Sequence, residues 1–235
     1  MPVKLFQAVF RMAGVAGKKI PRNIRYSFLT FVGIQERKER EKERRRKDIL
    51  DAARKLIKVK SYEEITMDEI ARELELARAT LYLYFSNKNE IYTTLLTDGL
   101  IDLMERYESA LSGIDESDPF SKMRALAAAF FAFYKESHSF FDLLVTKRDE
   151  LLRDSSESVQ ERFSAAGRRV IRPIADLYQD GVKAGHFMPA DPEKMAYIMR
   201  AIAIGMAVGF REGNLQFPAD LALLEGLLKN GVLRH

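Results

Sequence analysis

Residues 49–91 read ILDAARKLIKVKSYEEITMDEIARELELARATLYLYFSNKNEI, and this stretch decides the class of fold. It divides into three short helical patterns with tight connections, and the third is small and carries polar and aromatic side chains. This is the layout of a helix-turn-helix module, which places its last helix in the major groove of DNA. We therefore expect a DNA-binding head in this part of the chain.

Local signals define the helices of this head. Apolar residues recur along the first helix at the spacing of one buried face. Thr66 followed by Glu69 is a capping box, so the second helix is predicted to begin directly after Thr66. The third helix is predicted over residues 77–85, with Leu81 and Phe85 turned inward. The apolar face of the first helix comprises Ile49, Ala52, Ala53, Leu56 and Ile57.

The sequence after the head predicts a larger helical body. Short helix-breaking stretches separate its helical segments, and no strand-like alternation occurs. We expect an all-α fold with the DNA-binding domain in residues 36–90 and the body in residues 91–235. Pro173 is expected to kink the helix that contains it. The predicted body helices cover residues 88–112, 119–136, 138–154, 155–185, 191–213 and 218–230.

Residues 1–35 are predicted to be a flexible basic extension, with six Lys/Arg and no acidic residue. Glycines and Pro21 interrupt their apolar residues, which excludes the continuous core of a signal peptide. Three interpretations stay open: a disordered arm, an upstream start codon wrongly included, and a basic arm that touches DNA phosphate. Residues 36–47 alternate in charge and predict a solvated extension of the first helix.

The charge is unevenly distributed along the chain. Residues 1–90 hold 21 Lys/Arg and 13 Asp/Glu, whereas residues 91–235 hold 17 Lys/Arg and 21 Asp/Glu. A positive N-terminal part and a negative C-terminal part are expected if the head binds a polyanion and the body does not contact DNA.

Composition excludes several other classes of function. There is no cysteine, which excludes disulfides, thiolate metal sites and cysteine nucleophiles. No histidine lies near a serine–acid or paired-carboxylate pattern, so we expect no enzyme activity, no cofactor and no metal site. The longest apolar stretch, residues 195–210, is short for a membrane span and contains Arg200. We therefore expect a cytoplasmic protein.

The run of residues 69–91 resembles the DNA-binding signature of the TetR/AcrR-type (tetracycline-repressor family) transcriptional regulators. That signature has an E-I-A start, an A-G-V turn, a T-L-Y-x-Y/H-F recognition helix, and a lysine and a glutamate that open the next helix. The matching residues are Glu69-Ile70-Ala71, Leu74-Glu75-Leu76, Thr80-Leu81-Tyr82-Leu83-Tyr84-Phe85, Lys88 and Glu90.

The sequence departs from this signature at three positions. Glu75 stands where the turn has a glycine, so it must tolerate the backbone angle that the turn needs. Ala77 replaces the serine that often caps the third helix, and Ala79 replaces a glycine before the threonine.

The resemblance implies that the third helix contacts bases and that its surroundings contact phosphates. Arg78 opens this helix, where its guanidinium fork can grip a guanine. Lys88 and Thr66 lie near helix N-termini, where a phosphate binds favourably. Two alternatives stay open: Thr66 serves only as a helix cap, and Tyr84 is a core residue. The expected DNA contacts are Arg44, Arg45, Arg46, Thr66, Arg78, Ala79, Thr80, Tyr82, Tyr84 and Lys88.

The resemblance also implies an effector pocket between the central helices of the body. Its walls would come from the many aromatic residues there, and Arg172 or Arg200 could hold a carboxylate or a phosphate. The alternative for both arginines is an ion pair with a neighbour such as Asp176 or with a partner subunit. The candidate ligand contacts are Tyr107, Phe131, Tyr134, Phe141, Arg172, Tyr178 and Arg200.

Gly205 and Gly209 form a G-x-x-x-G pattern, which permits close approach of two helices. In the resembling family the last two helices of each subunit pair with their mates. We therefore expect a homodimer interface at Arg200, Gly205 and Gly209, with close packing inside one subunit as the alternative.

These observations favour a homodimeric transcriptional regulator, most often a repressor in this family, on a near-palindromic double-stranded operator. A small, mostly apolar effector is expected to release it. Two other classes stay open. One is a non-specific, architectural DNA-binding protein, and the other is a helical ligand-binding protein with a vestigial head.

Overall fold

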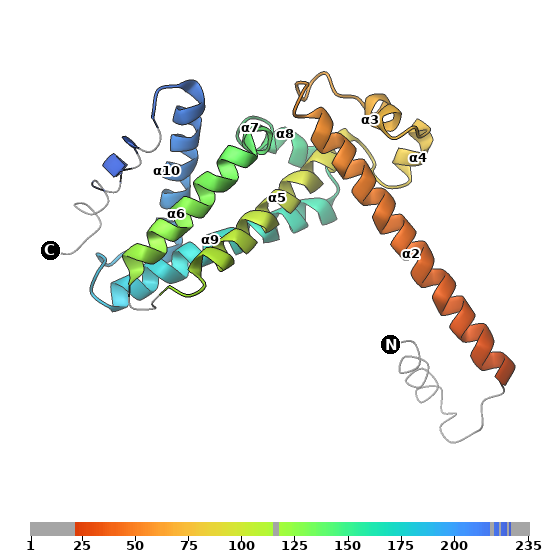
Figure 1. Cartoon of the computed structure of the whole chain (residues 1–235), viewed down its shortest axis with the longest axis horizontal. Helices are drawn as coiled ribbons and strands as arrows, with labels where there is room; N and C mark the ends of the chain where they lie inside the picture. Colours follow the sequence, from red (N-terminus) through yellow and green to blue (C-terminus); the bar gives the residue numbers. More distant parts are fainter. Residues whose placement is uncertain (1–21, 115–117, 217–218, 221, 225, 227–235) are drawn as a thin grey trace.

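The computed structural model describes residues 22–114, 118–216, 219–220, 222–224 and 226, and these residues contain helices and no strands (Figure 1). This confirms the predicted all-α class. The helices are α2 (Arg22–Leu56), α3 (Met67–Glu73), α4 (Arg78–Tyr82), α5 (Lys88–Leu111), α6 (Pro119–Glu136), α7 (His138–Thr146), α8 (Arg148–Arg153), α9 (Glu157–Lys183) and α10 (Pro192–Glu212).

The first described helix is much longer than the sequence indicates. Helix α2 has 35 residues, about 52 Å at 1.5 Å per residue, and its N-terminal part points away from the rest of the molecule (Figure 1). Residues 22–35, which the sequence assigns to a basic extension, are helical and continuous with the first helix of the head. Residues 33–44 are exposed and lack the apolar face by which a helix is recognised in a sequence. Residues 1–21 lie outside the described residues.

The head packs as the sequence predicts. The C-terminal part of α2, together with α3 and α4, encloses a small core. The two predicted inward residues, Leu81 of α4 and Phe85 just after it, are at most 1% exposed. The capping box is present, because the Thr66 hydroxyl accepts from the Glu69 N–H while the Glu69 carboxylate accepts from the Thr66 N–H. Other fully buried residues of this core include Ile49, Ala53, Ile65 and Ile70.

The body is built on α5, which packs against both α6 and α9, while α10 packs on α9 and α6 (Figure 1). The side chain of Asn87 accepts from the Glu90 N–H and so defines the start of α5. Phe141 of α7 lies at the centre of an aromatic cluster, with ring centroids 5.2–5.6 Å from its neighbours at edge-to-face angles. Those neighbours are Phe130, Phe133, Tyr134 and Phe140.

Two predicted boundaries are wrong. The helix expected over residues 138–154 is divided at Lys147 into α7 and α8, and the recognition helix is shorter than residues 77–85. Next to the division, the Thr146 hydroxyl donates back to the Asp142 carbonyl at 2.5 Å, a local hydrogen bond of the kind that bends helices. The helix predicted over residues 218–230 lies largely outside the described residues.

The structure places Pro173 inside α9 and ends α10 at Gly213, which has φ +76°. In the described part of the chain, no helix is both long enough and apolar enough to cross a membrane.

Candidate nucleic-acid interface and interior cavities

The turn between α3 and α4 fixes the direction of the recognition helix. Glu75 has φ +54°, the left-handed conformation that the missing glycine would supply, and costs about 1–2 kcal/mol relative to glycine. The Leu76 N–H bonds the Ala71 carbonyl at 2.9 Å, which closes the turn. Leu74 and Leu76 pack against the core on either side of Glu75. This packing holds the strained residue in place.

One face of α4 is open to solvent. Arg78, Ala79 and Tyr82 are exposed, and Thr80 is partly buried. Leu83, directly after the helix, is 77% exposed although it is apolar, so it is available to contact a partner surface. The opposite face is closed by Leu81. Helix α4 therefore presents a short row of polar and aromatic groups at the surface of the head.

Arg78 is held in place before any DNA is present. Its Nε and Nη2 donate to the Tyr82 hydroxyl at 3.2 and 2.9 Å, and its Nη1 donates to Asp68 at 3.1 Å. The hydrogen bond to Tyr82, followed by the charge of Asp68, raises the pKa of Arg78 above its ordinary value. The guanidinium is therefore a permanent, oriented cation on the exposed face of α4.

The arginines predicted on α2 have different surroundings. Arg44 is exposed, and Arg45 lies 3.8 Å from Asp48. Arg46 instead donates to the Tyr84 carbonyl at 2.7 Å, and its guanidinium lies 4.2 Å from the centre of the Phe85 ring. Arg46 thus connects α2 to the residues that follow α4.

The two residues predicted at helix N-termini also differ. Thr66 is exposed at the start of α3 and caps it, so its side chain lies at the surface. Lys88 points into the molecule: its Nζ donates to the Tyr62 carbonyl at 2.7 Å and lies 4.0 Å from the centre of the Tyr62 ring. Burial lowers the pKa of Lys88. A phosphate contact by Lys88 would first require these interactions to break.

Comparisons with known proteins agree with this geometry. A sequence profile of the family described as "Bacterial regulatory proteins, tetR family" matches residues 49–95. The "Uncharacterized HTH-type transcriptional regulator YhgD" of Bacillus subtilis (strain 168) is 26% identical over 190 residues, which are 81% of this chain and 95% of that protein.

Residues 49–95 match the DNA-binding domain of the tetR family. The chain is a DNA-binding transcriptional regulator with a helix-turn-helix head.

Solved structures share the fold of this regulator. A structure titled as the TetR-family regulator PfmR from Thermus thermophilus is 25% identical, with a TM-score of 0.57, and the match covers 69% of this chain and 85% of that one. A structure titled as the fatty acid degradation regulator FadR from Bacillus halodurans has 19% identity and a TM-score of 0.62, with 80% and 99% of the two chains covered.

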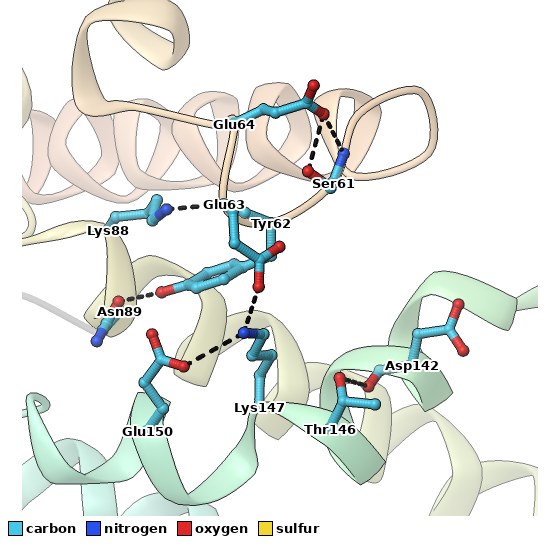
Figure 2. Close-up of polar contacts among 10 residues, drawn as sticks. All are labelled: Ser61, Tyr62, Glu63, Glu64, Lys88, Asn89, Asp142, Thr146, Lys147 and Glu150. Carbon is cyan, nitrogen blue, oxygen red and sulfur yellow. Dashed lines mark hydrogen bonds and ion pairs between the residues drawn. The ribbon is translucent and has the colours of Figure 1, made fainter.

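Head and body of the regulator meet at Lys147, the residue between α7 and α8 (Figure 2). Its ammonium bonds Glu63, in the loop that connects α2 to α3, and lies 3.5 Å from Glu150 of α8. The hydrogen bond from Lys147 is the largest cause of a lowered pKa at Glu63. Lys147 is only 25% exposed, so this ion pair is partly shielded from solvent.

A second set of contacts joins the same two parts. The Tyr62 hydroxyl donates to the Asn89 side chain, which in turn donates to the Asp154 carboxylate at 2.8 Å (Figure 2 shows the first of these). Asn87 donates to the Asp154 carbonyl at 2.9 Å. The loop after α2, the start of α5 and the end of α8 are therefore connected by polar side chains.

A cavity of about 320 Å³ lies in the body between α5, α6, α7, α9 and α10. Its deep wall is apolar and aromatic, and residues 148–150 of α8 lie at its polar side. Lys147, which holds the head, sits between the lining residues Thr146 and Arg148. The lining includes Leu103, Tyr107, Phe130, Phe141, Phe163, Val170 and Arg200.

A second, smaller cavity of about 100 Å³ lies between α6, α9 and α10. It shares Tyr107, Phe130 and Arg200 with the first cavity. The Nε of Arg200 is buried and has no hydrogen-bond partner among the described residues. The nearest aromatic partner of its guanidinium is Tyr197, with 5.1 Å to the ring centre.

Five of the seven candidate ligand residues line cavities. Tyr107, Phe131, Phe141 and Arg200 line one or both of the cavities above, and Tyr134 borders a minor space of about 10 Å³.

The structure corrects the other two candidates. Arg172 is 81% exposed and lies 3.6 Å from Asp176, the alternative that the sequence left open. Tyr178 donates to the Met188 carbonyl at 2.8 Å and stacks on Phe187, so it secures the loop after α9. Both residues were singled out by type and position alone, which do not say to which side a helical residue points.

Lys147 and Asp68 are the residues that sequence reasoning missed. A lysine directly after the apolar run HSFFDLLVT is a weak sign that the helix period ends there. The pairing of Asp68 with Arg78 has no sequence signal, because the two lie on different helices.

Helix α10 carries an exposed apolar face. Tyr197 and Ile198 are 39% and 50% exposed, and a Cβ added at Gly205 would meet no atom within 4 Å. Gly209 differs, since a Cβ there would lie 2.6 Å from the Leu215 side chain of the same chain. Gly209 therefore packs closely inside one subunit, which is the alternative that the sequence left open.

Proposed function

We propose that this regulator is a homodimeric repressor of a near-palindromic operator, released when a small, mostly apolar ligand enters the body. The observation that carries the proposal is the position of Lys147. It lies between two residues that line the larger cavity and pairs with Glu63 of the head. A ligand that displaces residues 146–150 would move the group that holds the head.

DNA reading by α4 is supported by its exposed polar face and its oriented arginine. A bidentate arginine contact to guanine contributes about 1–3 kcal/mol of discrimination between bases. Arg44, Arg45, Thr66, Thr80 and Tyr82 are available at the surface or near it for bases and phosphates.

Pairing of two subunits is supported by the exposed apolar face of α10. Tyr197, Ile198 and Gly205 fall on one side of the helix, where a flat glycine position allows close approach. A dimer would place two α4 helices on half-sites about 34–36 Å apart, or a multiple of that distance, as in other helix-turn-helix dimers.

Release by a ligand is supported by the cavity itself. Its volume lies at the lower end of the range of ordinary ligand sites, and its wall is mostly apolar. FadR of Bacillus halodurans, which shares the fold, is titled as a regulator of fatty acid degradation. The proposal places the protein with its operator DNA, in the cytoplasm of a bacterial cell.

The test is selection of binding sequences from random double-stranded DNA by the purified protein, followed by operator binding with and without candidate ligands. An enriched near-palindrome whose affinity falls when a ligand is added supports the proposal. Binding of all sequences alike, with affinity controlled by salt alone, would instead identify an architectural protein.

A further inference from the structure

Among the described residues, one charged side chain in the wall of the larger cavity has no ion-pair partner. Among the described residues, Arg148 pairs with Asp149 at 2.9 Å and Glu150 lies 3.5 Å from Lys147. Within the same described part of the chain, Arg200 has no ion pair, and its buried Nε has no hydrogen bond. A buried N–H without an acceptor destabilises the protein, so the unpaired Nε of Arg200 in a mostly apolar wall points to a missing acceptor.

A second donor lies beside the same space. Tyr107 is 4% exposed and lines both cavities. Burial raises the pKa of Tyr107, so the hydroxyl keeps its proton and can donate it. Tyr107 and Arg200 come from α5 and α10, and both residues line both cavities. An arginine and a phenol that line the same two cavities are suited to an anionic oxygen.

We propose that Arg200 and Tyr107 bind the anionic head group, a carboxylate or a phosphate monoester, of a ligand whose apolar chain occupies the larger cavity. This inference rests on the proposed function and names the ligand class for that site. The chain lies against Leu103, Phe130, Phe163 and Val170, which are apolar residues of the cavity lining.

The volumes set the size of the chain. A cavity of 150 Å³ holds one benzene molecule, so about 320 Å³ accommodates roughly twelve carbon atoms. The smaller cavity, about 100 Å³, is too small for a chain of that length and suits the head group or a short branch. A linear ligand of about ten carbons with one anionic end therefore matches the site.

The experiment measures binding of four ten-carbon probes to the full-length protein by isothermal titration calorimetry, without DNA. The probes are decanoate, decyl phosphate, 1-decanol and decyltrimethylammonium. We expect at least one anionic probe to bind at least tenfold more tightly than decanol, because hydrogen bonds to charged groups are the strong ones. Tighter binding of decanoate identifies a carboxylate ligand, and tighter binding of decyl phosphate identifies a phosphate ligand. Equal binding of decanol and both anions would overturn the proposal, as would binding of neither anion.

Three variants locate the contacts. Arg200→Met should remove the preference for the anion, whereas Arg200→Lys should keep part of it. Gly167→Leu should weaken binding of all probes, because Gly167 lines the larger cavity and a Cβ there meets no atom within 4 Å. Arg172→Met, an exposed arginine on α9, is the matched control and should bind as the wild type does.

Two results would contradict this placement. Retention of the anion preference in Arg200→Met would show that Arg200 does not hold the head group. Dissociation of that variant to monomers in sedimentation, with the preference intact, would show that Arg200 pairs with the partner subunit. Because the probes are tested without DNA, failure of operator selection affects only the proposed function. If an anion binds and operator affinity does not change, the ligand site is supported but its role in release from DNA is rejected.

Discussion

Arg78 is oriented by Tyr82 and Asp68 while it remains at the surface, which reduces the entropy lost when it binds a base. Its partners are also its competitors, because contact with guanine requires the guanidinium to leave at least one of them. Arg46 has the same chemistry but a different role, since it bonds the Tyr84 carbonyl in the partly buried interior of the head.

Arg78→Ala should weaken binding to the selected operator by about tenfold to a hundredfold and relax specificity at one base position. Fluorescence anisotropy with the selected operator and with single-base variants measures both effects. Arg169→Ala, an exposed arginine of the body, is the control and should leave affinity unchanged. Unaltered operator affinity and base preference in Arg78→Ala would exclude α4 as the reading element.

Arg46→Met should destabilise the head by about 1.5–3 kcal/mol, the usual contribution of a hydrogen bond to a charged group. Urea unfolding followed by circular dichroism measures the change. A stability equal to that of the wild type, with weaker DNA binding, would show that Arg46 is a DNA contact as the sequence first indicated.

At the scale of single elements, the segment from α7 to α8 connects the cavity to the head. Lys147 breaks the helix, and its ammonium lies between Glu63 and Glu150 (Figure 2). Glu63 is 60% exposed, so its ion pair with Lys147 is expected to contribute little to stability. We expect this ion pair to transmit movement from body to head, as the proposed release by a ligand requires.

Lys147→Met should leave the melting temperature nearly unchanged and reduce the loss of operator affinity caused by a saturating ligand. The measurement is operator affinity with and without that ligand, compared with the wild type. Lys183→Met, which removes a lysine paired only with Asp180 among the described residues, is the matched control. Full ligand response in Lys147→Met would show that another contact transmits the signal.

The pH dependence of this contact follows from the lowered pKa of Glu63. A carboxylate whose pKa is lower in the folded state stabilises the fold above its unfolded pKa, for which the ordinary glutamate value is 4.5. This contribution is lost as the pH falls through the lowered folded value. The difference in unfolding free energy between Glu63→Gln and the wild type should therefore be constant above the ordinary glutamate pKa and should shrink as the pH falls below it. Urea unfolding at several pH values checks this, and a difference that keeps growing between about pH 6 and pH 8 would contradict it.

The sequence predicts elements best where a local signal determines them. The capping box at Thr66, the inward Leu81 and the start of α5 are all local and correct. Prediction fails where no local pattern marks the boundary of a helix. Helix α2 begins at Arg22 although residues 33–44 have no buried face. The helix expected over residues 138–154 is divided at Lys147, which contacts the head.

The candidate site divides in the same way. The exposed face of α4 follows from helical period, whereas the direction of Arg172 and the contacts of Lys88 depend on tertiary packing. Sequence reasoning therefore identified the exposed face of α4 and part of the cavity wall, but not the contact between head and body.

For the molecule as a whole, the exposed face of α10 predicts the oligomeric state. Gly205→Leu should overpack a subunit interface and shift the protein toward monomers in sedimentation, at a typical cost of about 1–3 kcal/mol per site. Gly167→Leu is the control, because Gly167 lines an interior cavity. An unchanged dimer in Gly205→Leu would place the interface elsewhere.

The central claim is that two α4 helices, each with an oriented Arg78, read the two halves of one operator. Selection from random double-stranded DNA, carried out in parallel with the wild type and with Arg78→Ala, tests it most directly. The wild type should enrich a near-palindrome whose half-site centres lie about 10–10.5 base pairs apart, or a multiple of that spacing. The variant should lose preference at one symmetry-related base pair in each half-site. Enrichment of no motif by the wild type, or of the same motif with undiminished preference by the variant, would contradict the claim.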